Sequence, residues 1–411
     1  MVRKMKDSGV EWIGEIPEDW EVEKLKYIGA SKNETAIYKK GERFIGLEHV
    51  DSFNGNIIGQ DVDYDECETP IFEKGDFLFS KLRPYLAKGF LAEQRGFCTS
   101  ELIRIKFNEE QYNKYYKYLL LSHKFIDFVN SMTYGVKMPR TSWREVREQI
   151  LTVPPIQEQV IIANHLDEKC GSINDDIAII ENQLSVLEAY KKSVITEAVT
   201  KGLDKNAEMK DSGIEWIGEI PEHWNVVRGK YVLNLLSKPI RETDEVITCF
   251  RDGEVTLRSN RREDGFTMAD KEFGYQGIDI GDLVVHGMDG FAGAIGISDS
   301  RGKGSPVLSV LDSHFSKKFF MYYLRRVAYS DVFSALATGI RVRSVDLRWN
   351  KLANLPYPIP PLKEQEEISQ YIESRIAKSD EVVAIKQNQL SLLNEYKKSL
   401  IYEYVTGKRE V

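Results

Sequence analysis

One sixteen-residue stretch occurs twice in this chain and decides how the rest is organised. Residues 5–20 read MKDSGVEWIGEIPEDW and residues 209–224 read MKDSGIEWIGEIPEHW, with fourteen of sixteen positions identical at an offset of 204. A second match joins QLSVLEAYKKSVITEAVT at 183–200 to QLSLLNEYKKSLIYEYVT at 389–406, with twelve of eighteen positions identical at an offset of 206. A period near 205 in 411 residues is far longer than a solenoid repeat. The sequence therefore predicts two copies of a domain, each with its connector.

Both copies have the same internal order. Alternating and β-branched runs bounded by Gly and Asp predict strands in the body of each copy. These runs are FIGLEHV (44–50), DFLFS (76–80), ELIRIKF (101–107), EVITCF (245–250), DLVVHG (282–287), GAIGIS (293–298) and PVLSVLD (306–312). Aromatic-rich stretches at 111–130 and 316–337 favour helices. PPIQEQ at 154–159 and PPLKEQ at 360–365 then begin long segments without an internal proline, and a proline at the start of a helix is well tolerated.

The two long segments carry a coiled-coil pattern. Apolar residues of the first recur at heptad spacing, with further apolar residues between them, and the second keeps this pattern in part. The predicted seam residues are Leu166, Ile173, Ile177, Ile180, Leu184, Leu187, Ile376, Val383, Leu390 and Leu393. A pseudo-two-fold axis between the copies would make the two helices antiparallel.

Composition sets broad limits on the function. Apolar residues make up 42% and charged residues 29% of the chain, as in globular proteins with sizeable cores. The net charge of −8 excludes a strongly basic coating protein, but half of the acidic excess lies in 154–203, so the remaining chain can still present basic faces. Four widely spaced cysteines, no apolar run long enough for a bilayer and no signal-peptide pattern predict a cytoplasmic protein without a membrane span.

The sequence contains no convincing catalytic or metal-binding motif. Asn354-Leu355-Pro356-Tyr357 resembles the N-P-P-Y box of amino-methyltransferases, but its second position differs and no glycine-rich loop for a methyl donor accompanies it. Gly302-Lys303-Gly304-Ser305 lacks the earlier glycine of a phosphate-binding loop. Neither a His pair at i, i+4 nor a Cys/His cluster offers metal ligands. We therefore expect no catalytic residue and no metal site, and interpret 354–357 as a strand leading into the second double proline.

Basic loops late in each copy indicate contacts with DNA. The segment 135–140 aligns with 339–344, and each begins with Gly and precedes the last strand of its copy. The strand 76–80 leads into SKLRPY (80–85), whereas the equivalent strand of the second copy leads into HGMD (286–289). Arg and Lys on short loops suit phosphate oxygens and guanine edges, although solvated basic loops and ordinary loop drift are equally simple explanations. The candidate DNA contacts are Lys81, Arg83, Lys137, Arg140, His286, Arg301, Lys303, Arg341 and Arg343.

The whole arrangement resembles the specificity subunit of type I restriction–modification systems. Its most specific marks are the doubled M-K-D-S-G-[VI]-E-W-I-G-E-I-P-E-x-W opening, the P-P-[IL]-x-E-Q start of each helix and the Y-K-K-S-[VL]-I ending. The resemblance implies an α+β fold with two pseudo-symmetric mixed α/β target-recognition domains, separated by two long antiparallel coiled-coil helices. Residues 1–153 and 204–359 are the expected domains, and 154–203 and 360–411 are the expected spacer helices.

The resemblance also implies a function and partners. Each recognition domain would read one half of a bipartite, asymmetric site in double-stranded DNA. The helices would set the spacer and dock two methyltransferase (modification) subunits, through which restriction/translocase subunits join. The subunit itself would be non-catalytic and would bind no cofactor directly, because S-adenosylmethionine is used by the partner methyltransferase.

Two other functions stay open at this stage. A self-contained DNA methyltransferase or restriction enzyme would need a donor-binding loop and a true N-P-P-Y. A coiled-coil adaptor that reads no DNA would leave the two domains without a purpose.

Overall fold

The computed structural model describes residues 3–59, 64–135, 138–261, 273–330, 332–335 and 347–411. The DNA candidates Lys137, Arg341 and Arg343 lie outside the described residues. The chain forms two compact units: unit 1 comprises Met1–Glu181 with Gln387–Val411, and unit 2 comprises Asn182–Lys386. The units differ from the domain boundaries expected from the sequence, because each combines one domain with part of both long helices.

Outside its share of the two long helices, unit 1 has more residues in strands than in helices. The strands are β1 (Met5–Asp7), β2 (Glu15–Pro17), β3 (Glu21–Lys24), β4 (Gly29–Ser31), β5 (Thr35–Tyr38), β6 (Phe44–Ile45), β7 (Cys67–Phe72), β8 (Phe77–Ser80), β9 (Gly89–Leu91), β10 (Gly96–Cys98), β11 (Leu102–Phe107) and β12 (Ile150–Val153). The short helices are α1 (Leu25–Ile28), α2 (Asn113–Leu121), α3 (His123–Ser131) and α4 (Trp143–Val146), with 3-10 turns η1 (Leu47–His49) and η2 (Pro84–Leu86).

Unit 2 repeats this order with changes. Its strands are β13 (Met209–Asp211), β14 (Glu219–Pro221), β15 (Asn225–Arg228), β16 (Asn234–Leu235), β17 (Ile247–Cys249), β18 (Val255–Leu257), β19 (Gln276–Ile278), β20 (Leu283–His286), β21 (Ile295–Ile297), β22 (Gly302–Gly304), β23 (Leu308–Asp312) and β24 (Pro356–Ile359). Its short helices are α6 (Lys317–Tyr329), α7 (Val332–Ala335) and α8 (Trp349–Asn354), with 3-10 turns η3 (Gly229–Tyr231), η4 (Arg258–Asn260) and η5 (Gly290–Ala292).

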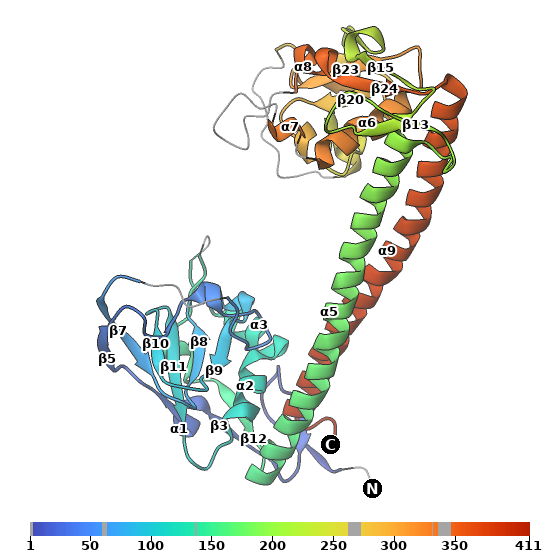
Figure 1. The fold of residues 1–411 in the computed structure, drawn as a ribbon. Helices are drawn as coiled ribbons and strands as arrows, with labels where there is room; N and C mark the ends of the chain where they lie inside the picture. Colours follow the sequence, from blue (N-terminus) through green and yellow to red (C-terminus); the bar gives the residue numbers. More distant parts are fainter. Residues whose placement is uncertain (1–2, 60–63, 136–137, 262–272, 331, 336–346) are drawn as a thin grey trace. The chain divides into compact units, whose positions relative to one another are not determined.

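Equivalent antiparallel sheets form the centre of each unit. The order is β4-β11-β8-β9 in unit 1 and β16-β23-β20-β21 in unit 2. Alternation along β8 sends Phe77 and Phe79 into a core shared with α2 and α3, and sends Leu78 into a second core on the opposite face. In Figure 1, α2 and α3 lie between this sheet and the lower part of the first long helix. Burial on both faces explains why the central strands read as continuous apolar runs.

The two long helices are confirmed. They are α5 (Ile156–Lys201) and α9 (Leu362–Val405), and in Figure 1 they run side by side in opposite directions. In unit 1 Lys397 Nζ lies 2.7 Å from Asn174 Oδ1, and in unit 2 the equivalent Lys191 contacts Asp380, so both units have the same antiparallel register. All ten predicted seam residues are buried or half-buried. The sequence-based fold class is therefore confirmed.

The repeated motifs meet one another inside each unit. The indole Nε1 of Trp20 donates to Glu158 Oε2 at 2.9 Å in unit 1, and that of Trp224 donates to Glu364 Oε2 at 3.1 Å in unit 2. Each bond joins the last Trp of an opening motif to the Glu of a P-P-x-x-E-Q motif. The strongest sequence matches thus lie where each domain is attached to the helices.

Glycines close these attachments. Gly202 and Gly407 follow the ends of α5 and α9 with φ of +71° and +70°, the left-handed conformation in which glycine caps helices. A Cβ on Gly407 would approach the Pro17 side chain to 2.3 Å, and one on Gly202 would lie 3.3 Å from the Trp224 ring. The end of each long helix therefore packs closely on an opening motif.

Two local expectations change and a third is confirmed. The run 44–50 is a strand only at β6, because Gly46 N donates to His49 Nδ1 at 3.0 Å and the chain turns into η1. The helix expected at 111–130 divides into α2 and α3 at Ser122, whose ψ of 141° is extended. The N-P-P-Y-like stretch lies in β24 and the end of α8, with Tyr357 fully buried, as the strand interpretation expected.

Candidate nucleic-acid interface

In unit 1 the candidate interface begins where β8 leaves the central sheet. The chain passes from Ser80 through η2 and returns as β9, which pairs with β8. Ser80 N donates to Lys88 O at 2.9 Å, and Ser80 Oγ donates to Leu82 O at 2.7 Å. We call residues 81–88 the exit turn of unit 1. It is held at both ends by the strand it leaves.

The second basic segment of unit 1 lies against this exit turn. Tyr134 and Arg140 form an isolated antiparallel bridge that closes a hairpin loop, and Leu82 bridges to Arg140 in the same way. Arg83 N donates to Pro139 O, and Thr141 N donates to Lys81 O, both at 2.8 Å. Backbone hydrogen bonds thus join two loops that are more than fifty residues apart in sequence.

The three described basic candidates of unit 1 differ in their partners. Lys81 Nζ donates to Ser100 O at 2.6 Å, and Arg140 pairs with Glu101 at 2.9 Å. Among the described residues, the Arg83 guanidinium has no ion pair or side-chain hydrogen bond, and its Nε is buried without a partner. A buried unsatisfied donor requires an explanation, and a bound ligand is one of those available. Arg83 is therefore the strongest of the three candidates.

Unit 2 has the same strand exit with a different turn. β20 is followed by residues 287–294, including η5, and then by β21, which pairs with β20. We call residues 287–294 the exit turn of unit 2. Leu347 N donates to Gly287 O at 2.8 Å, which is the counterpart of the bond from Thr141 to Lys81 in unit 1. The backbone arrangement of the exit turn is therefore repeated in unit 2, while the side chains of the turn differ.

His286 supports this turn rather than adding charge to it. Its Nδ1 accepts hydrogen bonds from Met288 N at 3.2 Å and from Asp289 N at 3.0 Å. Burial lowers the pKa of His286, so the ring is neutral near pH 7. Lys303, half-buried in β22, lies in a separate two-stranded sheet with β19.

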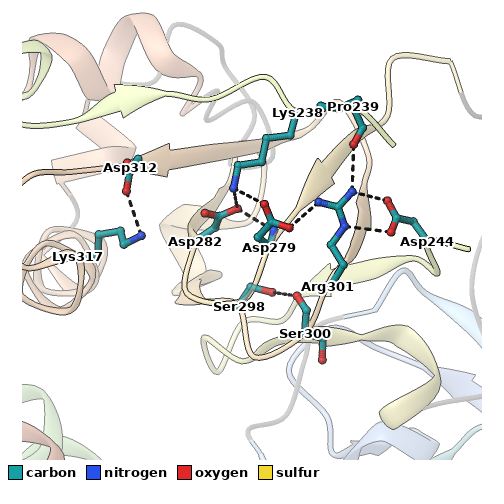
Figure 2. A network of polar contacts seen from close by, with 10 residues as sticks. All are labelled: Lys238, Pro239, Asp244, Asp279, Asp282, Ser298, Ser300, Arg301, Asp312 and Lys317. Carbon is teal, nitrogen blue, oxygen red and sulfur yellow. Dashed lines mark hydrogen bonds and ion pairs between the residues drawn. The ribbon is translucent and has the colours of Figure 1, made fainter. Parts of the chain in front are cut away.

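Arg301 lies at the centre of an ion-pair network, shown in Figure 2. Its guanidinium donates to both oxygens of Asp244 at 3.0 and 2.8 Å, to Asp279 Oδ1 at 2.6 Å and to Pro239 O at 3.1 Å. Lys238 completes the network by donating to Asp279 at 2.8 Å and to the neighbouring Asp282 at 2.6 Å. These partners indicate that Arg301 holds loops together, and its predicted contact with DNA stays a prediction.

The electrostatics of the network agree with this assignment. Hydrogen bonds from Lys238 and Arg301 lower the pKa of Asp279 to about 2. Asp244 is almost fully buried, and its hydrogen bonds with Arg301 lower its pKa and raise that of Arg301. All these groups are ionised at neutral pH.

Unit 1 contains a weaker version of the same network. Lys32 pairs with Asp76 at 3.1 Å and Arg95 pairs with Glu73 at 3.3 Å, and each residue lies 206 positions before its counterpart in unit 2. Arg95 and Glu73 are exposed, and within the described part of the chain Glu73 makes one ion pair. Aligning the two copies at this offset would have revealed four repeated charged positions, a signal that the search for basic loops did not use.

Sequence reasoning also missed the apolar part of the interface. In unit 1 Tyr85, Tyr134 and Met138 are exposed beside the basic candidates of the exit turn and hairpin. Bulky apolar side chains on a basic surface are a combination that nucleic-acid-binding proteins use. Within the described ranges, His, Cys, Asp and Glu form no group of three or more that could hold a metal ion. The helices in those ranges are also too polar to cross a membrane.

Comparisons with known proteins show what this chain is similar to. A family model described as "Type I restriction modification DNA specificity domain" matches residues 17–189. The type I restriction enzyme MjaVIII specificity subunit of Methanocaldococcus jannaschii is 25% identical over 419 residues, which cover 96% of this chain and 94% of that protein. The comparisons support a type I restriction specificity subunit, the family that the doubled motifs resemble.

Two further comparisons extend this result. The EcoBI specificity subunit of Escherichia coli is 24% identical over 327 residues, which cover 74% of this chain and 68% of that protein. A chain from a solved structure concerned with complex assembly and conformational transition of the type I restriction–modification system has a TM-score of 0.70 at 14% identity, and covers 96% of this chain and 99% of its own length. At that identity the likeness shows a shared fold.

Proposed function

We propose that this specificity subunit reads a bipartite site in double-stranded DNA, with each unit reading one half. The observation that carries the proposal is the pair of exit turns. Both leave equivalent strands, and each accepts a backbone hydrogen bond from a residue that follows a basic segment, Thr141 in unit 1 and Leu347 in unit 2, yet their side chains differ. A repeated frame with different contact residues is what two readers of two different half-sites require.

Exchanging the second domain tests this proposal. Residues 209–359 are replaced by the corresponding segment of another specificity subunit, and methylated motifs are read from the DNA of cells that also express the methyltransferase. We expect one half of the motif to change and the other to remain. A change in both halves would show that the domains do not read independently. The unchanged half is then the one assigned to the first domain.

We further propose that the helices dock two methyltransferase subunits. In unit 2 the contact between Lys191 and Asp380 sets the register, so Val186 and Ile385 lie at one level of the antiparallel pair, and Tyr190 is one turn away on α5. All three side chains are exposed. Exposed apolar groups on a helix pair favour a protein partner.

Unit 1 has its own copy of this apolar trio. Ile179, Leu392 and Tyr396 are exposed, and they correspond to Ile385, Val186 and Tyr190 by the 206-residue repeat. Two equivalent trios support two equivalent docking sites.

Paired charge substitutions test the stoichiometry. Val186→Asp with Ile385→Asp removes one trio, and Leu392→Asp with Ile179→Asp removes the other. We expect either pair to reduce the methyltransferase from two copies to one in native mass spectrometry, and all four changes to abolish association. Two copies retained by the fourfold variant, with helix content unchanged by circular dichroism, would place docking elsewhere.

The remaining parts of the proposal concern chemistry and location. We propose that the chain is non-catalytic and binds no cofactor itself, with S-adenosylmethionine used by the methyltransferase and restriction/translocase subunits joining through that partner. Kinship with restriction subunits that act on DNA supports a cytoplasmic location. Methylation of DNA by the purified chain with S-adenosylmethionine alone would contradict the first statement.

A further inference from the structure

The exit turn of unit 1 carries an exposed aromatic side chain at its centre. Tyr85 is the middle residue of η2, and 44% of its surface is exposed. Phe291 has the same place in η5, but it packs against the core of unit 2. The position can therefore hold a ring that faces inward. In unit 1 the ring faces solvent instead.

The same turn has a backbone that most residues avoid. Among the described residues, the non-glycine residues with positive φ are Phe53 (63°), Arg83 (49°) and Ala87 (46°). Arg83 and Ala87 flank η2, and Phe53 N donates to Ala87 O at 3.1 Å. The counterpart of Ala87 in unit 2 is Gly293, for which a left-handed φ is unstrained. Strain of this kind persists where neighbours fix the backbone, and it gathers at functional sites.

Several backbone bonds fix this turn. Arg83 N donates to Pro139 O, and Ala87 N donates to Pro84 O, both at 2.8 Å. Leu86 N donates to Arg83 O at 2.9 Å. A ring presented by a braced turn loses little conformational freedom on binding, which favours a specific contact.

The charges around the ring suit one kind of partner. Arg83 has no partner for its guanidinium among the described residues, and Lys81 and Arg140 lie on the same two joined loops. Cations beside a ring match the phosphates and base edges of a duplex. Within the major groove, the apolar group that a base pair offers to such a ring is the C5-methyl of thymine.

We infer that Tyr85 is a specificity-determining residue of the first domain and packs its ring on a thymine methyl group in that domain's half-site. The inference rests on the proposed DNA reading and adds the chemistry of one contact to it. The second domain lacks the counterpart, because Phe291 is used in its core. Arg83, on the same turn, holds a neighbouring phosphate.

Replacing thymine by uracil in the DNA tests the contact without altering the protein. The probe is a fluorescent duplex carrying the motif that the assembled complex methylates in cells, with deoxyuridine in place of thymine in the first half-site only. Uracil keeps base pairing and removes only the methyl group. We expect the parent complex to bind this duplex about fourfold more weakly, the value of one buried methyl group.

Protein variants complete a double-mutant cycle between Tyr85 and the thymine methyl group. Tyr85→Ala should bind the thymine duplex at least about fivefold more weakly than the parent and should bind the uracil and thymine duplexes equally. Tyr85→Phe keeps the ring and should keep the fourfold preference. Phe291→Ala is the matched control: it should loosen unit 2 but leave the preference at the first half-site unchanged.

The outcomes separate the inference from the proposed function. A parent complex that binds uracil and thymine duplexes equally, a first half-site without an A·T pair, or a Tyr85→Ala variant with the parent's preference would overturn the inference alone. A parent complex that does not prefer its motif duplex over a scrambled duplex of the same composition would overturn the proposed function itself.

Discussion

Replacing Arg301 by Met distinguishes a structural role of this residue from a DNA contact. Met keeps much of the side-chain volume but removes every ion pair of the guanidinium. Asp244, with only 2% of its side chain exposed, would lose both of its short contacts with Arg301. A buried carboxylate left without its cation costs about 3–5 kcal/mol.

The loss of stability expected for Arg301→Met follows from how exposed Arg301 and its carboxylate partners are. Arg301 is 21% exposed, so water reaches part of the site and we place the Asp244 contribution at about 2–3 kcal/mol. Asp279 is 42% exposed, and its pair with Arg301 adds at most about 1 kcal/mol after solvent screening. We therefore expect a local destabilisation of unit 2 by about 3 kcal/mol. If amide hydrogens exchange through local opening, a decrease of this size in the free energy of opening makes their exchange about a hundredfold faster.

Arg95→Met is the matched control in unit 1. Arg95 has the equivalent position, but its one ion-pair partner among the described residues is Glu73, and both side chains are about half exposed or more. Exposed pairs contribute up to about 1 kcal/mol. Hydrogen exchange followed by mass spectrometry reads both variants in the intact chain, at β20 for Arg301→Met and at β8 for Arg95→Met.

The network also gives stability a pH dependence of known sign. The pKa of Asp279 is lowered to about 2 in the folded state and is about 3.9 when unfolded. Its contribution is therefore complete above about pH 4 and is lost as the pH falls towards 2. Arg301→Met removes one of the two hydrogen-bond donors that cause the shift, so β20 of the variant should lose less protection than that of the parent between pH 5 and pH 2.

One pair of results would refute this reasoning. The first result is amide exchange at β20 that is unchanged by Arg301→Met, and the second is a salt slope of DNA binding that falls by about one unit. Together they would make Arg301 a phosphate contact, as the sequence analysis predicted.

Three further predictions concern the candidate interface and the helices. Arg341→Ala with Arg343→Ala should lower the salt slope of DNA binding by up to about two units, if both neutralise phosphates, and an unchanged slope would move the contact surface elsewhere. Lys397→Met removes the hydrogen-bond donor to the amide oxygens of Asn54 and Asn174, so amide hydrogen exchange near Asn54 should become faster by the equivalent of about 1–2 kcal/mol. The control Lys191→Met removes an ion pair with the exposed Asp380 and should change the free energy of local opening by less than about 1 kcal/mol. Four residues can be added to both helices, between Ser185 and Val186 and between Ile385 and Lys386, which lengthens each helix by about 6 Å. The gap between the two halves of the methylated motif should then grow by one or two base pairs. An unchanged gap would mean that the helices serve only to dock the methyltransferase.

The sequence was sufficient for the periodic parts of the fold. Heptad spacing located α5 and α9, and apolar runs located β8, β11, β20 and β23, because burial of a face imposes a period that one sequence displays. The break at Ser122 was missed because it depends on a single ψ angle within an otherwise helical pattern.

The candidate interface was predicted in part. The two basic loops of unit 1 do come together, as Arg83 and Pro139 show, but their individual side chains could not be ranked from composition. Arg301 looked like a loop cation because its partner Asp244 lies 57 residues away and only the tertiary structure brings the two together. The sequence also could not show that Tyr85 is exposed whereas Phe291 is half-buried against the core, since both are aromatic residues in a turn.

The differences between the two units are concentrated where recognition would require them. The ion-pair network recurs at the same offset in both units, and so does the backbone hydrogen bond to the exit turn from Thr141 in unit 1 and from Leu347 in unit 2. Within the turns, by contrast, the aligned residues differ: Arg83 aligns with Asp289, Tyr85 with Phe291 and Ala87 with Gly293. Drift unrelated to function would not spare a strained backbone at Ala87, which a glycine would relieve. The proposed contact of this turn with DNA would explain that strain, which lies beside an Arg83 guanidinium without a partner among the described residues.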